Sequence, residues 1–222
     1  MSVNEVTDSI KDLNIQDDKE DKNIYEKQQD YIINELKKLL QNDKNHKKEI
    51  IKCETIKDTH IYCKINNLTG QQMGPLIEFY IKEKFSMEKN KAGDCIGDCK
   101  DRFLEDNEIK ASGGGKNHNS YNYVQLRLNH KLHNYIFTAY YLTNRNYMNG
   151  GELFIFKIKK ETLYSLINEH GQYAHGTVSK LGKITIEDLK KDNNTKEYCL
   201  RPKYGDKLWG KLLKYRVNES DL

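Results

Sequence analysis

The sequence lacks three features that would place it in a membrane or outside the cell. It contains no run of 18 apolar residues, so a membrane-spanning helix and a membrane partner are not expected. Residues 1–22 lack the basic and then apolar pattern of a secretory signal peptide. The five cysteines form no C-x₂-C pair, and their odd number argues for free thiols. The sequence therefore predicts an intracellular protein that is not secreted, located in the cytoplasm or, for a viral protein, in a host-cell compartment.

Charge is distributed unevenly along the chain. Residues 1–22 contain seven acids, three lysines and no aromatic residue, which gives this segment a net charge of −4 and predicts a disordered tail. The whole chain carries +4, so residues 23–222 carry +8, the difference between +4 and −4. These residues suffice for a single domain. A moderately basic domain is compatible with nucleic-acid binding, although a lysine-rich composition also follows from an AT-rich genome.

Hydrophobic periodicity in the first half predicts helices separated by β structure. Apolar residues at helical spacing predict a helix over 24–40, and β-branched residues in rough alternation predict one or two strands over 49–65. Thr69 as a cap and Pro75 in an early turn predict an amphipathic helix over 69–85, which carries Glu78 among apolar neighbours.

The second half is dominated by predicted strands. Residues 94–112 are expected to form a β-hairpin, followed by a glycine-rich loop over 113–120. Further strands are predicted over 122–128, 135–142 and 152–158, helices over 161–169 and within 204–217, and a short strand running into a helix over 184–191. This order of elements predicts an α/β fold in which one central mixed β-sheet is flanked by helices.

The predicted hairpin carries acidic residues that are suited to a metal site. A residue early in the first strand lies opposite one late in the second, so Asp94 or Asp98 can face Glu108. Asp94 leaves more room for two strands and is slightly preferred, while Asp98 is the alternative or supporting ligand. Two such carboxylates can hold Mg²⁺. Lys110 shares the strand face of Glu108, because side chains alternate with period two.

Three roles are open to Lys110. It can orient an attacking water, lower the pKa of that water together with a metal, or stabilise charge on a phosphate. The alternative interpretation is an exposed strand with ordinary alternating charges. His130 and His133 are interpreted as solvated residues at a strand end rather than as a metal-binding pair.

The motifs in this region, taken in order, resemble those of the PD-(D/E)xK nuclease superfamily, and more narrowly of type II restriction endonucleases. The matching residues are Gly74, Pro75 and Glu78; Gly93-Asp94 or Gly97-Asp98; Glu108, Lys110 and Ser112; and Gln125 with Arg127. The chain departs from the family pattern in having glycine, where proline is common, before either aspartate.

The resemblance covers about residues 70–158 and implies a restriction-endonuclease-like core, with 159–222 as a DNA-recognition part. It implies that Asp94 or Asp98 and Glu108 bind the metal and that Lys110 serves catalysis. It further implies that Glu78 assists a metal and that Gln125 lines the catalytic site.

The activity implied by the resemblance is Mg²⁺-dependent hydrolysis of phosphodiester bonds in double-stranded DNA at defined sequences, commonly by homodimers on palindromes. Side chains suited to phosphates or base edges are Lys116, Asn119, Arg127, His175 and Lys203. Two alternatives remain open. One is a repair, recombination or homing nuclease of the same fold, and the other is a DNA-binding protein without catalysis.

Overall fold

The computed structural model describes residues 28–29, 31–32, 45–91, 93–114, 119–174, 181–182 and 184–222. Contacts divide the chain into two units, Met1–Asn45 and His46–Leu222. In the first unit the helical residues 28–29 and 31–32 fall within the predicted helix, whereas the predicted tail over 1–22 lies outside the described residues. Within the described ranges, no helix is both long enough and apolar enough to span a bilayer.

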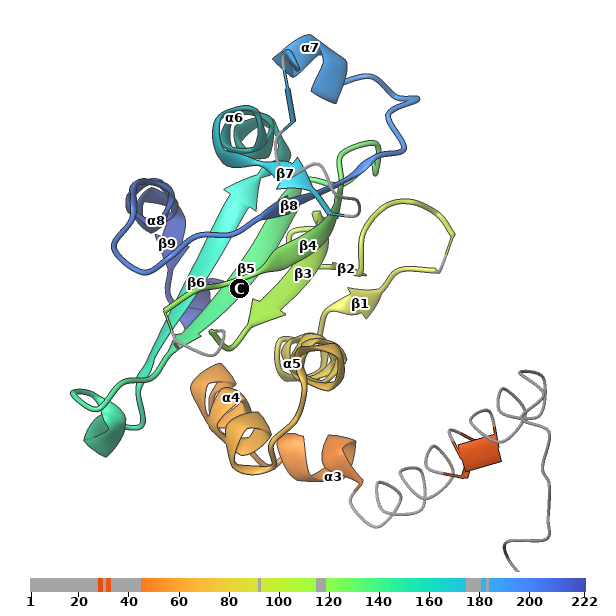
Figure 1. The fold of residues 1–222 in the computed structure, drawn as a ribbon. Helices are drawn as coiled ribbons and strands as arrows, with labels where there is room; N and C mark the ends of the chain where they lie inside the picture. Colours follow the sequence, from red (N-terminus) through yellow and green to blue (C-terminus); the bar gives the residue numbers. More distant parts are fainter. Residues whose placement is uncertain are drawn as a thin grey trace, which may run out of the picture. The chain divides into compact units, whose positions relative to one another are not determined.

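The second unit is built around a six-stranded central sheet with strand order β1-β2-β3-β5-β6-β9 (Figure 1). Its strands are β1 Glu88–Lys89, β2 Cys99–Lys100, β3 Asp106–Ser112, β5 Asn134–Tyr141, β6 Glu152–Lys159 and β9 Arg216–Val217. β3 and β5 are parallel, and the other neighbouring pairs are antiparallel. The predicted mixed central sheet is therefore confirmed.

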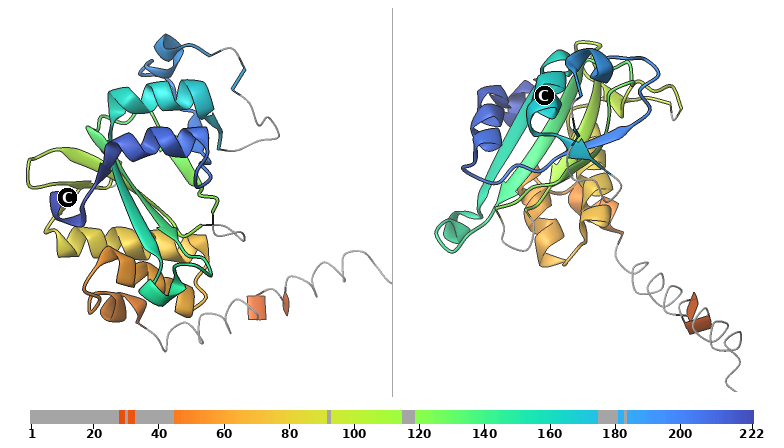
Figure 2. Two further views of the ribbon diagram at one scale, coloured as in Figure 1. Left: turned by 90° about the vertical axis from the view of Figure 1, so that its left-hand side faces the viewer. Right: turned by 45° about the horizontal axis from the view of Figure 1, so that its top comes forward.

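Helices cover both faces of the central sheet (Figure 2). One face packs against α4 and α5 through a cluster that includes Ile136 and Ile155, and the other packs against α6 and α8 through Phe137 and Phe156. Successive residues of a strand point to opposite faces, which explains why neighbours such as Ile136 and Phe137 enter different clusters. The helices are α3 His46–Ile50, α4 Ile56–Ile65, α5 Gly70–Lys84, α6 Lys160–His170, α7 Ile186–Leu189 and α8 Lys207–Leu212.

A second, antiparallel sheet has the order β4-β8-β7, so the strand predicted over 122–128 lies outside the central sheet. Its strands are β4 Tyr123–Arg127, β7 Gln172–Tyr173 and β8 Glu197–Leu200. The chain leaves the central sheet after β3, forms β4 and returns as β5. The pairing of Arg127 with Glu197 joins segments far apart in sequence, and periodicity within β4 carries no information about that partner.

The predicted strands over 49–65 are wrong, because most of this segment forms α4. Thr55 and Asp58 form a capping box at its start. Its buried side chains, Ile56, Thr59, His60 and Cys63, have the spacing of one helical face. The strand expected at the start of 184–191 is also absent from the described part of that segment, which contains only α7. The described residues also form three short 3₁₀ helices, η1 Tyr147–Asn149, η2 Leu213–Tyr215 and η3 Glu219–Asp221.

Candidate active site

A cavity of about 790 Å³ lies along the edge of β3. Glu78 of α5, Lys110 of β3 and Gln125 of β4 are among the residues that line it. On β3, β2 pairs only with Asp106 and Asn107, so the following residues of β3 have no strand beside them on that edge within the described ranges. The cavity therefore brings together three segments of the chain at an open strand edge.

The structure places Asp98, and not Asp94, beside Glu108. The Asp98 carboxylate accepts a hydrogen bond from the backbone N–H of Ile109, with Oδ2 and N 2.8 Å apart. Burial raises the pKa of Asp98, and the nearby charge of Glu108 raises it further. Asp94 is exposed in the turn that precedes β2. The slight preference for Asp94 assumed two long strands, whereas β2 contains only Cys99 and Lys100.

Glycine before Asp98 is required by packing. Gly97 has a φ of +89°, and a Cβ built on it would lie 2.6 Å from the backbone oxygen of Asn107. The backbone N–H of Asp98 donates to that same oxygen at 2.8 Å. A Cβ on Gly93, in contrast, would meet no atom within 4 Å. Of the two Gly-Asp pairs in the sequence, only Gly97-Asp98 therefore lies so close to another backbone segment that a side chain in place of the glycine would clash.

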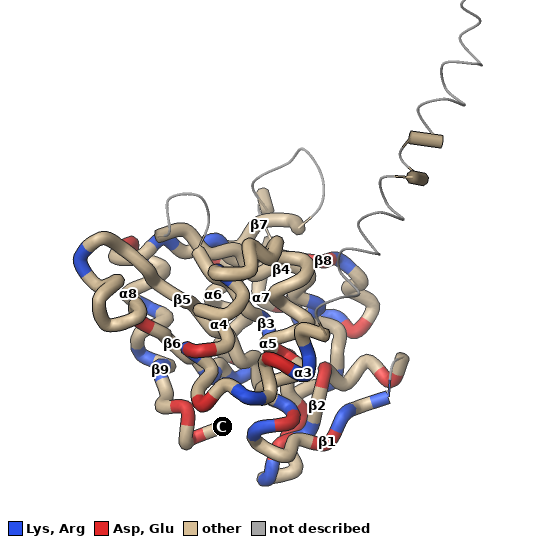
Figure 3. The backbone as a smooth tube through the Cα atoms, turned by 90° about the horizontal axis from the view of Figure 1, so that it is seen from below, with Lys and Arg blue, Asp and Glu red and all other residues tan. Residues whose placement is uncertain are grey.

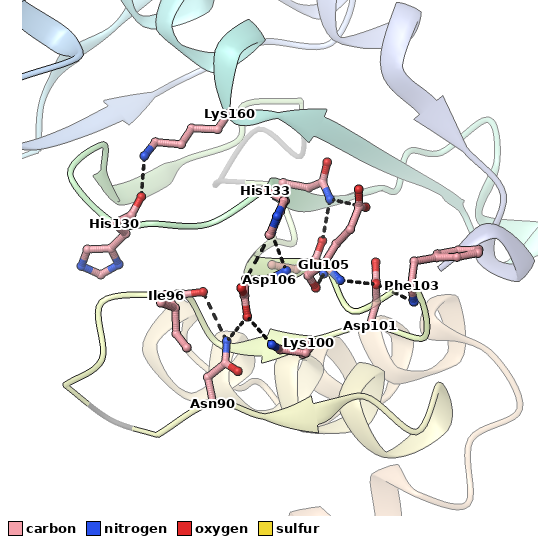
Figure 4. Close-up of polar contacts among 12 residues, drawn as sticks. Asn90, Ile96, Lys100, Asp101, Phe103, Glu105, Asp106, His130, His133 and Lys160 are labelled. Carbon is pink, nitrogen blue, oxygen red and sulfur yellow. Dashed lines mark hydrogen bonds and ion pairs between the residues drawn. The ribbon is translucent and has the colours of Figure 1, made fainter. Parts of the chain in front are cut away.

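Asn90 ties the loop that carries Asp98 to the start of β3 (Figure 4). Its side-chain amide donates to the carbonyl of Ile96 and to Oδ1 of Asp106, each at 3.2 Å. The backbone N–H of Asp106 in turn donates to Nδ1 of His133 at 2.9 Å. Asn90 was not identified from the sequence, because its contacts depend on the folded loop.

Glu108 and Lys110 form an ion pair, with 2.6 Å between Oε1 and Nζ. They align with Tyr135 and Phe137 of the parallel strand β5. Aligned residues share a sheet face, so both side chains lie on the face that carries Tyr135 and Phe137. Glu108 is buried, and a charged hydrogen bond that is shielded from water is stronger than one at the surface.

Glu78 forms an ion pair with Lys82, one turn further along α5. The positive charges of Lys110 and Lys82 oppose the effects of burial and of Glu108 on the pKa of Asp98. Lys82 therefore belongs to the electrostatic environment of the site, a role that was not expected from the sequence. Its position one turn after Glu78 is the signal that could have revealed it.

Gln125 occupies an irregular position in β4. The register with β8 shifts between Tyr123 and Leu126, and Gln125 has a φ of +56°. A non-glycine residue in this left-handed region costs about 1 kcal/mol. The exposed Gln125 lines the cavity. The bulge thus places an amide side chain among the residues that surround the site.

The predicted DNA contacts have different environments. Asn119 and Lys203 lie near the cavity, because Ser120, which lines the cavity, forms a β-bridge with Lys203. Arg127 is paired with Glu197, at 2.6 Å between Nη2 and Oε1. Lys116 and His175 lie outside the described residues.

His130 is near the site and was not assigned to it from the sequence. Burial lowers its pKa, and the positive charges of Arg127 and Lys110 lower it further. Its Nδ1 is buried and has no hydrogen-bond partner among the described residues. The next residue, Lys131, donates its backbone N–H to the carbonyl of Cys95 at 2.7 Å, which joins this loop to the one that carries Asp98.

The donor set fits a magnesium ion better than a structural zinc. In the described ranges, no three His, Cys, Asp or Glu side chains are grouped closely enough to hold a metal among themselves. Mg²⁺ is commonly held by one or two carboxylates together with water and substrate phosphates. Asp98 and Glu108 supply such a pair, and the like charge of Glu108 beside the largely buried Asp98 favours a cation there.

No family model matches this sequence, and it has no significant match among curated proteins or solved structures. Function therefore has to be inferred from the residues of the site.

Proposed function

We propose that this protein is a Mg²⁺-dependent endodeoxyribonuclease that hydrolyses phosphodiester bonds of double-stranded DNA. The observation that carries the proposal is the meeting of Asp98, Glu108 and Lys110 on β3 and the loop before β2, where Lys110 also lines a cavity of about 790 Å³. Two carboxylates suit a hard divalent cation, and a neighbouring ammonium suits a phosphate or an attacking water. We also propose that the central sheet and α5 form a restriction-endonuclease-like core.

In this proposal Asp98 and Glu108 would hold Mg²⁺, which when bound lowers the pKa of a water and polarises a phosphoryl oxygen. Asp98 uses Oδ2 for the hydrogen bond to Ile109, which leaves Oδ1 for the cation. The Lys110 ammonium orients the attacking water or donates to a phosphate oxygen. Gln125 offers an amide that can hydrogen-bond the substrate backbone.

The proposed substrate is a DNA strand that lies along the open edge of β3. Residues 23–222 carry a net charge of +8, which supports binding to a polyanion. Figure 3 shows basic and acidic residues interspersed around β1, β2 and β9, so charge of one sign does not dominate that side. Contacts close to the cavity, including Asn119 and Lys203, would therefore have to contribute to binding. Sequence-specific cleavage and a two-fold dimer on a palindromic site are further parts of the proposal.

Cleavage of supercoiled plasmid DNA in Mg²⁺ tests the proposal. The wild-type protein is expected to give discrete fragments. Glu108→Gln and Lys110→Ala should each lower the rate by about 100-fold or more, which is typical for loss of a charge-stabilising group. Exposed residues with the same chemistry provide matched controls, Glu83→Gln on α5 and Lys131→Ala, and these should cleave normally.

Other outcomes distinguish the alternatives. Preferential cleavage of branched or damaged DNA over intact plasmid would favour a repair or recombination nuclease of the same fold. Salt-sensitive binding without cleavage in Mg²⁺ or Mn²⁺, unchanged by Glu108→Gln, would instead identify a non-catalytic DNA-binding protein.

A further inference from the structure

The hairpin between β5 and β6 ends in an exposed tip, residues 143–149, which contains the 3₁₀ helix η1. The side chains of Tyr147 and Met148 are 60% and 79% exposed. Exposed large apolar residues that lie together on a soluble protein commonly mark an interaction site.

The tip has a defined conformation. Asn146 holds it from within, because its Oδ1 accepts from the backbone N–H of Thr143 at 2.6 Å and its Nδ2 donates to the carbonyl of Tyr141 at 3.1 Å. Helix α4 also stabilises the tip, because Nζ of Lys57 donates a hydrogen bond to the carbonyl of Asn149 at 3.2 Å. A preformed contact loses little conformational entropy when it binds a partner.

The tip lies at the same end of the central sheet as Ser112–Gly114 of the cavity lining, whereas Glu108 is aligned with Tyr135 near the start of β5. β3 and β5 are parallel, with Ser112 aligned to Ala139, so both strands end on the side where the tip projects (Figures 1 and 2). Tyr147 follows Tyr135, the residue aligned with Glu108, by twelve positions, which limits its distance from Tyr135 to about 40 Å. One turn of B-DNA spans about 34 Å. A duplex that extends a little more than one turn beyond a phosphodiester at Glu108 is therefore long enough to reach the tip.

The chemistry of the tip suits a DNA groove. Its two apolar side chains are accompanied by the exposed polar residues Asn144 and Arg145. Proteins that bend DNA insert apolar side chains of this kind between base steps and place cations near the phosphates. A stable protein–protein interface buries about 800 Å² on each partner, from roughly 20–30 residues, which is far more than residues 143–149 offer.

We propose that the tip is a DNA-binding wedge, in which Tyr147 and Met148 enter the minor groove between base pairs about one turn from the cleaved bond and Arg145 contacts a phosphate. This inference rests on the proposed nuclease function, since it requires that duplex DNA lies in the cavity.

The double variant Tyr147→Ala/Met148→Ala tests the wedge, with Phe103→Ala/Leu104→Ala as its matched control. Phe103 and Leu104 are 62% and 73% exposed in the β2–β3 bend, at the opposite end of the central sheet. Both pairs are placed in a Glu108→Gln background and titrated against a duplex that contains 2-aminopurine, a base whose fluorescence rises when it is unstacked. The tip variant is expected to bind at least about tenfold more weakly and to lose the fluorescence rise, as for removal of a stacking side chain. The control variant should keep both.

Equal affinity and equal fluorescence for the two variants would overturn the wedge. Plasmid cleavage by the wild-type protein would then still support the proposed function. If the wild-type protein neither binds nor cleaves DNA, the proposed function fails and the wedge fails with it. Sedimentation velocity tests whether the tip instead joins two copies of the chain. If the wild type and the control variant form a dimer and the tip variant does not, the tip is a contact between copies and the wedge is overturned.

Discussion

The Asp98 carboxylate accepts a hydrogen bond from the backbone N–H of Ile109 at the open edge of β3, with 2.8 Å between Oδ2 and N. This contact fixes the carboxylate beside Glu108, at the point on β3 where the pairing with β2 has ended and Ile109 and Lys110 line the cavity. One carboxylate oxygen thus has a structural role, and the other remains available for the proposed cation.

Asp98→Asn is expected to abolish cleavage without destabilising the fold. Asparagine keeps an oxygen that can accept from Ile109, and it removes a charge that burial and Glu108 disfavour, as the raised pKa of Asp98 indicates. The free energy of unfolding at pH 7, from urea titration, should equal or exceed the wild-type value. Asp94→Asn, at the exposed and sequence-similar step, should change neither property. Lost activity in Asp94→Asn together with full activity in Asp98→Asn would reverse the assignment.

Lys82→Met is expected to strengthen binding of a divalent cation. Its ammonium pairs with Glu78 and acts on Asp98, so it offsets the negative charge that would attract a metal. Removal of one unit charge at short range, in a medium of intermediate dielectric constant, should lower the dissociation constant for Mn²⁺ roughly tenfold. Calorimetric titration without DNA measures this directly. Lys84→Met, at an exposed position on the same helix, is the control, and equal effects from both substitutions would argue against a specific role for Lys82.

Gln125→Gly is expected to raise the stability of the fold and to lower the cleavage activity. Glycine adopts the φ of +56° without strain, so the free energy of unfolding should rise by about 1 kcal/mol. Cleavage should fall, because the amide at the cavity is lost. Gln125→Asn keeps an amide on a residue type that tolerates this conformation, and it should be intermediate in both measurements. A glycine variant that is less stable than the wild type, or fully active, would contradict the role given to this bulge.

His60 should make the fold sensitive to acid. It is fully buried between α4 and β5, where its Nε2 lies 3.1 Å from Oγ1 of Thr138, and burial lowers its pKa to about 3. The unfolded chain takes up a proton on this residue below about pH 6.5, whereas the folded chain does not until about pH 3. The stability that follows from a neutral His60 is therefore complete above pH 6.5 and is lost as the pH falls toward 3.

Urea titrations at pH 7 and pH 4.5 measure this loss. His60 should contribute about 3 kcal/mol of destabilisation over that interval, so the loss should be smaller by this amount in His60→Gln. The half-buried His46 provides the control His46→Gln, which should retain the wild-type loss. Identical pH dependence in the wild type and His60→Gln would show that protonation of His60 does not govern the acid response.

Elements with a strong local pattern could be predicted from the sequence. Strands β5 and β6 and helices α5 and α6 lie where periodicity places them, with ends that differ by at most one residue. Helix α4 could not be recognised in this way, because β-branched residues in its sequence also fit a strand. The partner of β4 was missed because sheet pairing across about 70 residues is set by tertiary packing.

The site was predictable only where it depends on local geometry. The shared face of Glu108 and Lys110 follows from strand periodicity. The choice between Asp94 and Asp98 depends on the close approach of Gly97 to Asn107, which no spacing rule contains. Asn90, Lys82 and His130 join the environment of the site through folded contacts. The nuclease activity itself stays a prediction until cleavage is measured.

The cavity wall formed by β4 depends on β8, whose Glu197 pairs with Arg127. During synthesis, α5 and β3 leave the ribosome long before β8 does, so a growing chain lacks the partner that holds Gln125 in place. Long-range pairing of this kind also forms slowly after release. If the proposed nuclease activity is correct, the protein would be latent while nascent and would gain its full active site only after residues 197–200 have been synthesised.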